Sequence, residues 1–147
     1  MGKPTNVWNL ELEDIDDGRR GARLLERPPG THLVGAVWEL DPGASSGPYH
    51  VHHATEEFVL VLDGQATLRS PDGERELPRG EVVHFPTGSP GAHQILNRSD
   101  APVRYLMVAA HSGTDLIEYV DEKQVVAYSH WPSHIQEEGL FFTHDLE

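Results

Sequence analysis

The hydrophobic positions of this chain fall in short runs that glycine and proline interrupt, and no long segment repeats with the period of a helix. The runs recur at intervals of about 8–12 residues, a spacing typical of all-β sandwiches and barrels. The predicted strands are 23–26, 33–40, 49–52, 57–62, 66–70, 75–77, 82–85, 93–97, 103–109, 115–119 and 124–128. The pattern therefore predicts an all-β fold built from many short strands.

Turn residues between the apolar runs support this prediction. Asp63-Gly64 lies between two apolar runs, and Pro71-Asp72-Gly73 repeats the arrangement a few residues later. Glycine reaches positive φ at low cost, so both sequences favour hairpins. The strand 58–62 is apolar without alternation, which predicts that both of its faces are buried. One face would line a barrel, and the other would meet a second sheet or a second subunit.

The length of 147 residues predicts one domain, here with two flanking segments. Residues 23–110 carry most of the predicted strands and would form the barrel. Residues 1–22 are acidic and poorly patterned, and they are predicted to form an N-terminal arm, either flexible or added as an edge strand. Residues 111–147 form a C-terminal extension that is too apolar for disorder and is expected to pack on the barrel or on a partner subunit. Its aromatic residues include Tyr128, Trp131, Phe141 and Phe142.

Composition and charge restrict the class of partner. The formal net charge of −13, from 24 acidic and 11 basic residues, argues against binding to nucleic acid or to anionic membranes. A small-molecule ligand is the better expectation. The absence of cysteine excludes disulfides and thiolate-bound metals and fits a reducing cytoplasm. No membrane-spanning apolar run and no secretory signal peptide is recognisable, so we expect a cytoplasmic protein outside the membrane.

Three histidines and one glutamate are the candidate metal ligands. His50 and His52 are two residues apart, so a strand places both side chains on one face. A short turn over 53–56 would bring Glu57 to the start of the next strand, and His93 lies at the start of a later strand. Imidazoles and a carboxylate suit a divalent transition metal. The four side chains would converge if the sheet closes on itself.

The spacing of these residues resembles the first motif of the cupin superfamily, whose members are double-stranded β-helix, or jelly-roll, barrels. That motif consists of a glycine, a His-X-His pair, three or four residues, a glutamate, six residues and a second glycine. Here it matches His50, His52, Glu57 and Gly64. The upstream glycine is displaced, because Gly43 lies one residue before the expected position and Ala44 occupies it.

The second cupin motif is also recognisable downstream. It matches Gly80, Pro86, Gly88, His93 and Asn97. Two extra residues precede His93, and they fall in a glycine- and proline-rich loop that can absorb them. Together the two motifs extend the resemblance over roughly residues 35–110, with predicted strands between them in the appropriate order.

The resemblance implies that His50, His52, Glu57 and His93 bind one divalent metal, with coordination positions left open for water or substrate. The metal could be Fe, Mn, Ni, Cu or Zn. Glu57 is also a candidate catalytic base, because cupin glutamates are proposed to leave the metal and accept a proton. Cupins commonly form dimers, so a homodimer is expected as well.

Three functions remain open at this point. A metal-dependent enzyme would act on a small organic molecule, as a dioxygenase with a redox metal or as an isomerase, lyase or decarboxylase with a Lewis-acid metal. A non-catalytic barrel would instead bind a small ligand such as a sugar or a carboxylate. A sugar-phosphate isomerase would need a basic anchor for the phosphate. The candidate anchors, none clearly aimed at the site, are Arg23, Arg69, Arg75, Arg98 and Arg104.

The remaining histidines and aromatic residues receive weaker assignments. His53 is predicted to face solvent, His84 could face either way, and Trp38 is expected to pack in the core. Surface positions are expected for His111, His130, His134 and His144. Candidate pocket residues are Tyr49, Gln94 and Tyr105.

Overall fold

The computed structural model describes residues 4–25, 32–111, 113–128 and 141–147. Within these ranges the regular structure is β-strand apart from one short 3₁₀ turn, η1 (Ser89–Gly91), so the predicted all-β class is confirmed. Three positions named above, His130, Trp131 and His134, lie outside the described residues. The described part of the chain contains no helix long and apolar enough to cross a bilayer.

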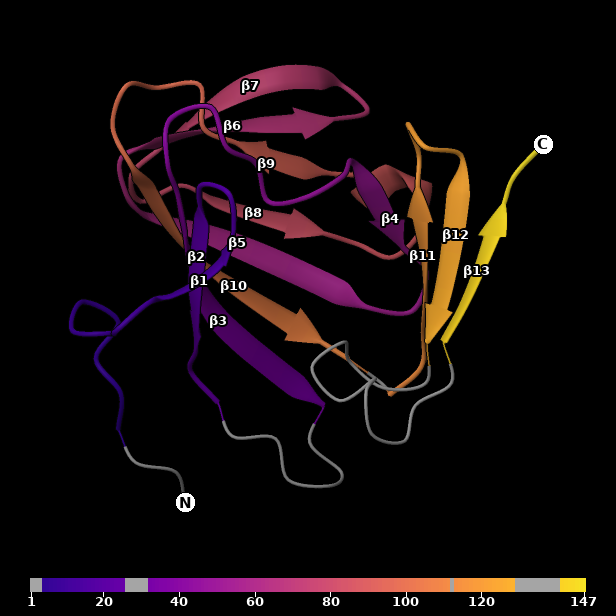
Figure 1. Ribbon diagram of the computed structural model, residues 1–147, viewed down its shortest axis with the longest axis horizontal. Helices are drawn as coiled ribbons and strands as arrows, with labels where there is room; N and C mark the ends of the chain where they lie inside the picture. The colour runs from indigo at the N-terminus through magenta and orange to yellow at the C-terminus, as the bar shows by residue number, and fades with distance from the viewer. Residues whose placement is uncertain (1–3, 26–31, 112, 129–140) are drawn as a thin grey trace.

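The largest sheet has six strands in the order β1-β2-β3-β10-β5-β8 and crosses the middle of the molecule (Figure 1). Two smaller sheets, β7-β6-β9 and β13-β12-β11-β4, complete the jelly-roll sandwich. The strands of the large sheet are β1 (Glu13–Asp16), β2 (Arg19–Arg23), β3 (Leu33–Leu40), β5 (Glu56–Asp63), β8 (Val82–Phe85) and β10 (Val103–Ala110). Those of the smaller sheets are β4 (His50–His52), β6 (Gln65–Ser70), β7 (Gly73–Pro78), β9 (Gln94–Leu96), β11 (Asp115–Tyr119), β12 (Gln124–Tyr128) and β13 (Phe141–Asp145).

An isolated bridge joins the two smaller sheets. The amide of His50 donates to the carbonyl of His93 over 3.1 Å, and the amide of His93 donates back over 2.9 Å. In the described part of the chain the strands therefore form a sandwich with a seam between β4 and β9, and not one continuous hydrogen-bonded ring. Residues opposite each other in an antiparallel bridge project their side chains to the same face, so the seam brings two of the predicted ligands together.

The core lies between the large sheet and the sheet β7-β6-β9. Val59 and Val61 on β5 contact the same buried cluster as Leu68 on β6 and Ile95 on β9. The outer face of β5 differs from the inner face, because Phe58 remains 37% exposed. No second sheet within the described residues covers Phe58. The prediction that both faces of this strand are buried is therefore wrong at Phe58 within a single chain.

The hairpin between β5 and β6 shows why the sequence has glycine there. Gly64 has a φ of +78°, and a Cβ atom at this position would lie 2.7 Å from the carbonyl oxygen of Pro102. Any other residue would suffer both an unfavourable backbone angle and a steric clash. The predicted Asp63-Gly64 turn is confirmed, and it sets the register of the strand that carries Glu57.

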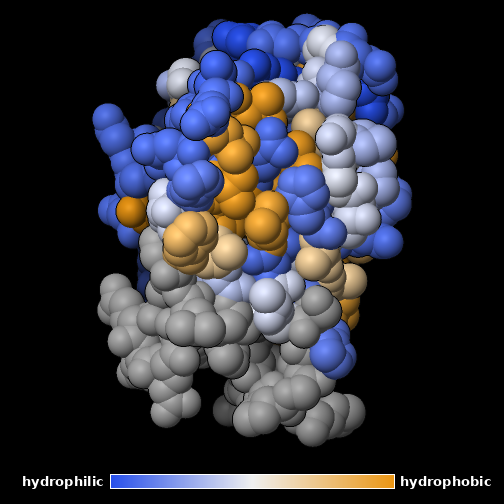
Figure 2. Space-filling model, turned by 90° about the vertical axis from the view of Figure 1, so that its right-hand side faces the viewer, coloured by the Kyte–Doolittle hydropathy of each residue, from blue (hydrophilic) through white to orange (hydrophobic). Residues whose placement is uncertain are grey.

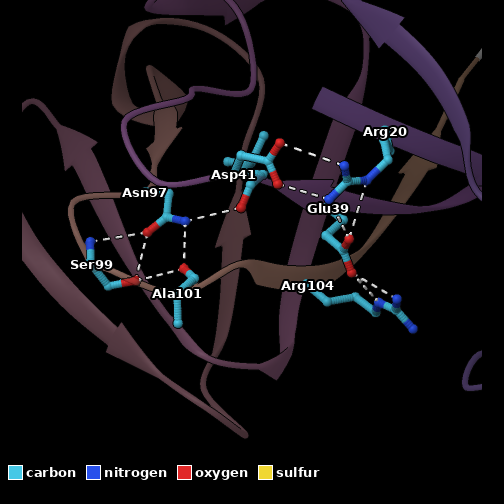
Figure 3. Close-up of polar contacts among 8 residues, drawn as sticks. Arg20, Glu39, Asp41, Asn97, Ser99, Ala101 and Arg104 are labelled. Atoms are coloured by element: carbon cyan, nitrogen blue, oxygen red, sulfur yellow. Dashed lines mark hydrogen bonds and ion pairs between the residues drawn. The ribbon is translucent and has the colours of Figure 1, made fainter. Parts of the chain in front are cut away.

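Asn97, the last residue of the second motif, has a structural role. Its side-chain amide donates to the carbonyls of Leu40 (2.9 Å) and Ala101 (2.8 Å), and its oxygen accepts hydrogen bonds from the amide and hydroxyl of Ser99 (Figure 3). These bonds satisfy buried polar groups where β9 ends and the chain turns toward β10. Asn97 therefore fixes the exit of β9, the strand that follows His93.

Glu39 on β3 lies between two arginines on the outer face of the large sheet. Arg20 donates to one carboxylate oxygen (2.8 Å), and Arg104 donates to the other (2.7 Å) (Figure 3). Burial opposes the charge of Glu39, but the hydrogen bonds from Arg104 and Arg20 leave its pKa below the ordinary value. The network ties β2 to β3 and β10, so it holds the N-terminal strands on the sheet.

The C-terminal extension adds strands beside β4. Ile117 and Tyr119 on β11 are the register partners of His52 and His50, so the extension borders the strand with the paired histidines. The outer face of this added sheet carries exposed apolar side chains, including Leu116 and Phe142. Figure 2, viewed from the side of β13, shows apolar side chains gathered in a patch bordered by hydrophilic ones.

Candidate metal centre

His50, His52 and Glu57 form a group that could hold a metal ion. Their potential ligand atoms all lie within 4.8 Å of one another. The two histidines come from β4, where alternation places Val51 on the opposite face, and Glu57 comes from β5 in the large sheet. Glu57 and His52 are both buried. The sandwich therefore places a carboxylate from one sheet opposite two imidazoles from another.

His93, the fourth predicted ligand, lies beside the same carboxylate. Its Nε2 is 3.1 Å from Oε2 of Glu57, and its ring centroid is 4.5 Å from that of His50. The ring stacks on Phe85 with a centroid distance of 3.8 Å, which restricts its rotation. All four predicted residues thus meet at one place, although the tightest cluster contains only His50, His52 and Glu57.

The lengthened loop before His93 helps to orient it. The two extra residues fall in the segment that forms η1, and the carbonyl of Gly91 at its end accepts a hydrogen bond from Nδ1 of His93 (2.9 Å). Gly91 is closely packed, because a Cβ atom there would lie 1.7 Å from the carbonyl oxygen of Pro86. The insertion is therefore compatible with the predicted ligand role of His93.

The same arrangement recurs at the other two histidines. Nδ1 of His50 lies 2.9 Å from the carbonyl oxygen of Pro48, and Nδ1 of His52 lies 2.5 Å from Oδ2 of Asp115. A carbonyl oxygen and an ionised carboxylate oxygen can only accept a hydrogen bond, so the proton of a neutral ring must lie on Nδ1 at all three histidines. In their neutral form, all three histidines therefore keep the lone pair of Nε2 available, and this is the form that binds a metal.

This choice of tautomer leaves an excess of lone pairs around Glu57. Nε2 of His93 and Nε2 of His52 lie 3.1 and 3.6 Å from the same carboxylate oxygen. When both rings are neutral, a lone pair faces an ionised oxygen at each contact, and this repulsion is relieved by a proton or a metal cation. Two ligand atoms each about 2.1 Å from one ion and at right angles would lie about 3.0 Å apart. The residues present therefore fit a divalent cation.

Asp115 is part of the site, and sequence reasoning did not single it out. Besides Nδ1 of His52, its carboxylate accepts hydrogen bonds from the amides of Ala54 (2.8 Å) and Leu116 (2.9 Å). Burial opposes its charge, but the hydrogen bond from His52 and further donors leave the pKa of Asp115 below its ordinary value. Asp115 is an anionic acceptor that fixes the orientation of His52 from the C-terminal extension.

Electrostatics prepare the cluster for a cation. Burial, together with the neighbouring His93 and His52, lowers the pKa of His50 to about 4, so this ring is neutral at pH 7. Burial opposes ionisation of Glu57 too, but contact with His93 and the nearby His52 leave the pKa of Glu57 lowered. Burial also disfavours protonated His52, yet Asp115 and Glu57 outweigh it and raise the pKa of His52. An ionised carboxylate thus lies among imidazoles at neutral pH.

A cavity of about 450 Å³ opens onto these residues. Its volume falls in the range of about 300–1,000 Å³ that is typical of small-molecule sites. The C-terminal extension contributes Ile117, Tyr119 and Tyr128 to the walls, and β10 contributes Tyr105. Among the predicted pocket residues, Tyr105 does line this cavity. Trp38, predicted to pack in the core, is partly buried and also lines it.

The other two predicted pocket residues have different surroundings. Tyr49 is buried beneath the guanidinium of Arg69, which lies 4.2 Å from the ring centroid. The side-chain amide of Gln94 donates to the carbonyl of Gly47 over 2.7 Å. Neither residue lines the cavity that contains the histidines.

The histidines outside the cluster have different surroundings. His53 and His84 face solvent, near Glu118 and Glu56 respectively, and His144 is exposed. The expected surface position of His111 is wrong: the residue is 2% exposed, and its Nδ1 lies 3.1 Å from Oγ1 of Thr55. His111 continues the inward parity of Ala109 beyond the end of β10, and this parity buries it.

One arginine that sequence reasoning passed over lines the cavity. Arg19 on β2 contributes to the wall, whereas none of the five arginines considered from the sequence does. Arg69, Arg98 and Arg104 instead form ion pairs with Asp121, Glu74 and Glu39. In a strand, the neighbours Arg19 and Arg20 must point to opposite faces. The pairing of β2 with β3 decides that Arg19 is the one that faces the interior.

Comparisons with known proteins agree with the fold. The family model described as Cupin domain matches residues 36–109. The quercetin 2,3-dioxygenase of Bacillus subtilis (strain 168) is 33% identical over 92 residues, which make up 61% of this chain and 27% of that protein. The chain spans only 27% and 63% of the lengths of the curated relatives that it matches.

Solved structures match more of the chain. A protein from Silicibacter pomeroyi, named a sugar phosphate isomerase from a cupin superfamily, has a TM-score of 0.77 and 27% identity. That match covers 95% of this chain and 92% of the other. The polyketide cyclase RemF from Streptomyces resistomycificus has a TM-score of 0.62 and 27% identity, covering 74% of this chain and 79% of the other.

Proposed function

The chain belongs to the cupin family, and from that premise we propose that it is a metal-dependent enzyme acting on a small organic molecule. The proposed ligands are His50, His52, Glu57 and His93. The observation that carries the proposal is the set of three imidazoles whose Nδ1 atoms are all engaged by oxygen acceptors beside one buried carboxylate. This arrangement supports a role in cation binding over a purely structural role for the cluster.

Isomerase-type chemistry is the proposed reaction class. The structural relative named a sugar phosphate isomerase matches nearly the whole chain, whereas the dioxygenase relative shares only 27% of its own length with it. The cavity also contains a basic side chain, Arg19, which a substrate with an anionic group requires. Both observations favour rearrangement of a polar small molecule over oxygen insertion.

The side chains have separate parts in such a reaction. A bound divalent metal would supply Lewis acidity toward a carbonyl oxygen of the substrate. Glu57 is ionised at neutral pH and is the proposed general base, which accepts a proton from the carbon next to that carbonyl. Burial raises the pKa of Tyr105, so its hydroxyl stays protonated and can donate a hydrogen bond to a substrate oxygen.

Elemental analysis tests the metal site directly. Protein purified without chelator or histidine tag is expected to hold near-stoichiometric divalent metal, which His93→Ala should lose. His53→Ala is the matched control, because His53 faces solvent one residue beyond His52. Absence of metal from the wild type, even after reconstitution, would reject the proposal and leave a non-catalytic ligand-binding barrel.

An activity screen tests the reaction class. Metal-loaded protein is expected to interconvert aldose and ketose forms of a sugar phosphate without consuming oxygen. Glu57→Gln should lower kcat by about 100-fold or more if Glu57 is the base. Oxygen uptake with quercetin, and no isomerisation of any sugar phosphate, would favour the dioxygenase alternative.

The proposal extends to assembly and organisation. We propose a cytoplasmic homodimer. Each subunit would consist of an N-terminal arm (1–22), a barrel (23–110) and a C-terminal extension (111–147). The partly exposed Phe58 and the apolar outer face near Leu116 and Phe142 offer surface that a second copy could cover. Light scattering that reports a monomer at micromolar concentration would contradict the dimer.

A further inference from the structure

We infer that Arg19 binds an oxyanion, a phosphate or a carboxylate, at one end of the substrate while another part of the substrate reaches the histidines. The inference rests on the proposed function, because it takes the cavity beside the candidate metal ligands as the substrate site. It adds an anchor residue and a substrate class: small molecules that carry an anionic oxygen group.

The direction of Arg19 follows from strand alternation. On β2, Arg20 points outward to Glu39 and Asp41 (Figure 3), so its neighbour Arg19 points to the other face. The register partner of Arg19 is Leu40, which is completely buried. Arg19 thereby reaches the cavity that also holds His50, His52, Glu57 and His93, and it is the only lysine or arginine among the described residues that line it.

The guanidinium retains binding capacity in this position. It donates to the carboxylate of Asp16 over 2.5 Å and to the carbonyl of Ser46, while its buried Nε has no hydrogen-bond partner within the described residues. A guanidinium is a planar fork of five donors that matches carboxylate and phosphate groups. Asp16 is 53% exposed, and exposed ion pairs contribute little stability, so a ligand oxyanion can replace it at low cost.

Backbone contacts connect Arg19 with the candidate metal ligands. Ser46 accepts from Arg19, and two residues further along Pro48 accepts from Nδ1 of His50. One short segment therefore contacts both the proposed anchor and a proposed ligand. A small molecule in the cavity of about 450 Å³ can reach both ends of this segment.

Tyr105 gives a second measure of proximity. Burial raises the pKa of its hydroxyl, the positive charge of Arg19 lowers it, and the negative charge of Glu57 raises it again. The hydroxyl thus lies within electrostatic reach of both groups, and Tyr105 lines the same cavity as Arg19 and Glu57. One molecule bound in this cavity can therefore contact both Arg19 and the residues beside Glu57.

Trp38 supports the guanidinium from one side. The Cζ atom of Arg19 lies 5.5 Å from the centroid of the Trp38 ring, a distance at which the charge and the ring attract. Gly21, on the same face of β2, makes room for this ring, since a Cβ atom there would lie 2.6 Å from it. The arrangement holds a cation in a chain whose net charge of −13 otherwise repels anions.

Titration with inorganic phosphate and with acetate tests the inference. Calorimetry at constant ionic strength on the full chain, both metal-loaded and after chelation, gives the affinity of each anion. Arg19→Gln should weaken binding by about tenfold or more, and Arg19→Lys should restore part of the loss. Asp16→Asn should tighten binding, because it removes the competing carboxylate. Arg79→Gln, a matched loss of charge at an exposed turn, should leave the affinity unchanged.

The outcomes are distinct. Weaker binding in Arg19→Gln alone supports the anchor, and the tighter of the two anions indicates a phosphate ester or a carboxylate. The inference would be overturned if Arg19→Gln bound the anions as tightly as wild type, or if Arg19→Gln and Arg79→Gln lost the same affinity. It would also be overturned if wild type bound neither anion. If Arg19→Gln does not fold, Asp16→Asn decides, since unchanged or weaker binding there contradicts the inference.

Metal content separates this inference from the proposed function. Arg19→Gln should retain its metal, whereas His52→Ala should lose metal and still bind phosphate through Arg19. Wild-type protein that binds phosphate through Arg19 but no metal would refute the metal-dependent function and leave the anchor standing.

Discussion

Replacement of Asp115 by asparagine offers a sharp test of how the site is oriented. Oδ1 of Asp115 accepts from the amides of Ala54 and Leu116, and an asparagine carbonyl in the same place can accept both bonds. Its amide nitrogen would then face Nδ1 of His52, where the carboxylate lies 2.5 Å away. Two donors cannot face each other, so His52 must move its proton to Nε2, the atom proposed to bind the metal.

The expected loss follows from the hydrogen bond that disappears. A hydrogen bond to a charged group is worth about 1.5–3 kcal/mol, which corresponds to about 10- to 150-fold in affinity. Removal of partners that orient metal-binding histidines typically costs about 10- to 100-fold. We therefore expect Asp115→Asn to weaken metal binding by one to two orders of magnitude. The metal-free fold should change little, because His52 with its proton on Nε2 can accept from the asparagine at Nδ1 and donate toward Glu57, 3.6 Å away.

Competition with a chelating dye measures the affinity, and thermal unfolding of the metal-free proteins measures the stability. Asp121→Asn is the matched control, since Asp121 has the same side chain in an exposed ion pair with Arg69. An affinity of Asp115→Asn within about twofold of wild type would refute the tautomer argument. A large loss of metal-free stability would instead show that Asp115 mainly supports the fold.

Three further predictions follow from individual contacts. His52→Ala should lose the metal yet keep its circular dichroism spectrum, because apolar strands supply most of the stability; an unfolded variant from a metal-free wild type would contradict this. Gly91→Ala should lower the free energy of unfolding by about 1–3 kcal/mol in urea, since its Cβ would lie 1.7 Å from the oxygen of Pro86, and unchanged stability would show that the loop relaxes freely. Glu39 has a pKa below its ordinary value of 4.5, so its ion-pair network contributes fully above that pH and is lost as the pH falls through the folded pKa. Glu39→Gln should therefore be less stable at pH 7 and show a flatter acid dependence, and parallel stability curves for the two proteins would oppose this account.

Much of the strand pattern could be predicted because alternation and turn residues act locally. The strands predicted over 33–40, 82–85, 115–119 and 124–128 coincide with β3, β8, β11 and β12. β1 and most of β2 were not predicted, because the residues of this acidic N-terminal segment lack a regular apolar alternation. β13 was also missed, and its described side chains from Phe142 onward are exposed, so burial left no pattern to read.

The sequence alone determined the class of fold and the four candidate ligands, because strand parity and motif spacing depend on residues close together in the chain. The tertiary structure decided which sheets face each other and therefore which distant side chains join the site. Asp115 reaches His52 across 63 positions, and Arg19 enters the cavity only because β2 pairs with β3. Contacts of this kind arise from long-range strand pairing, whose partners no local pattern specifies.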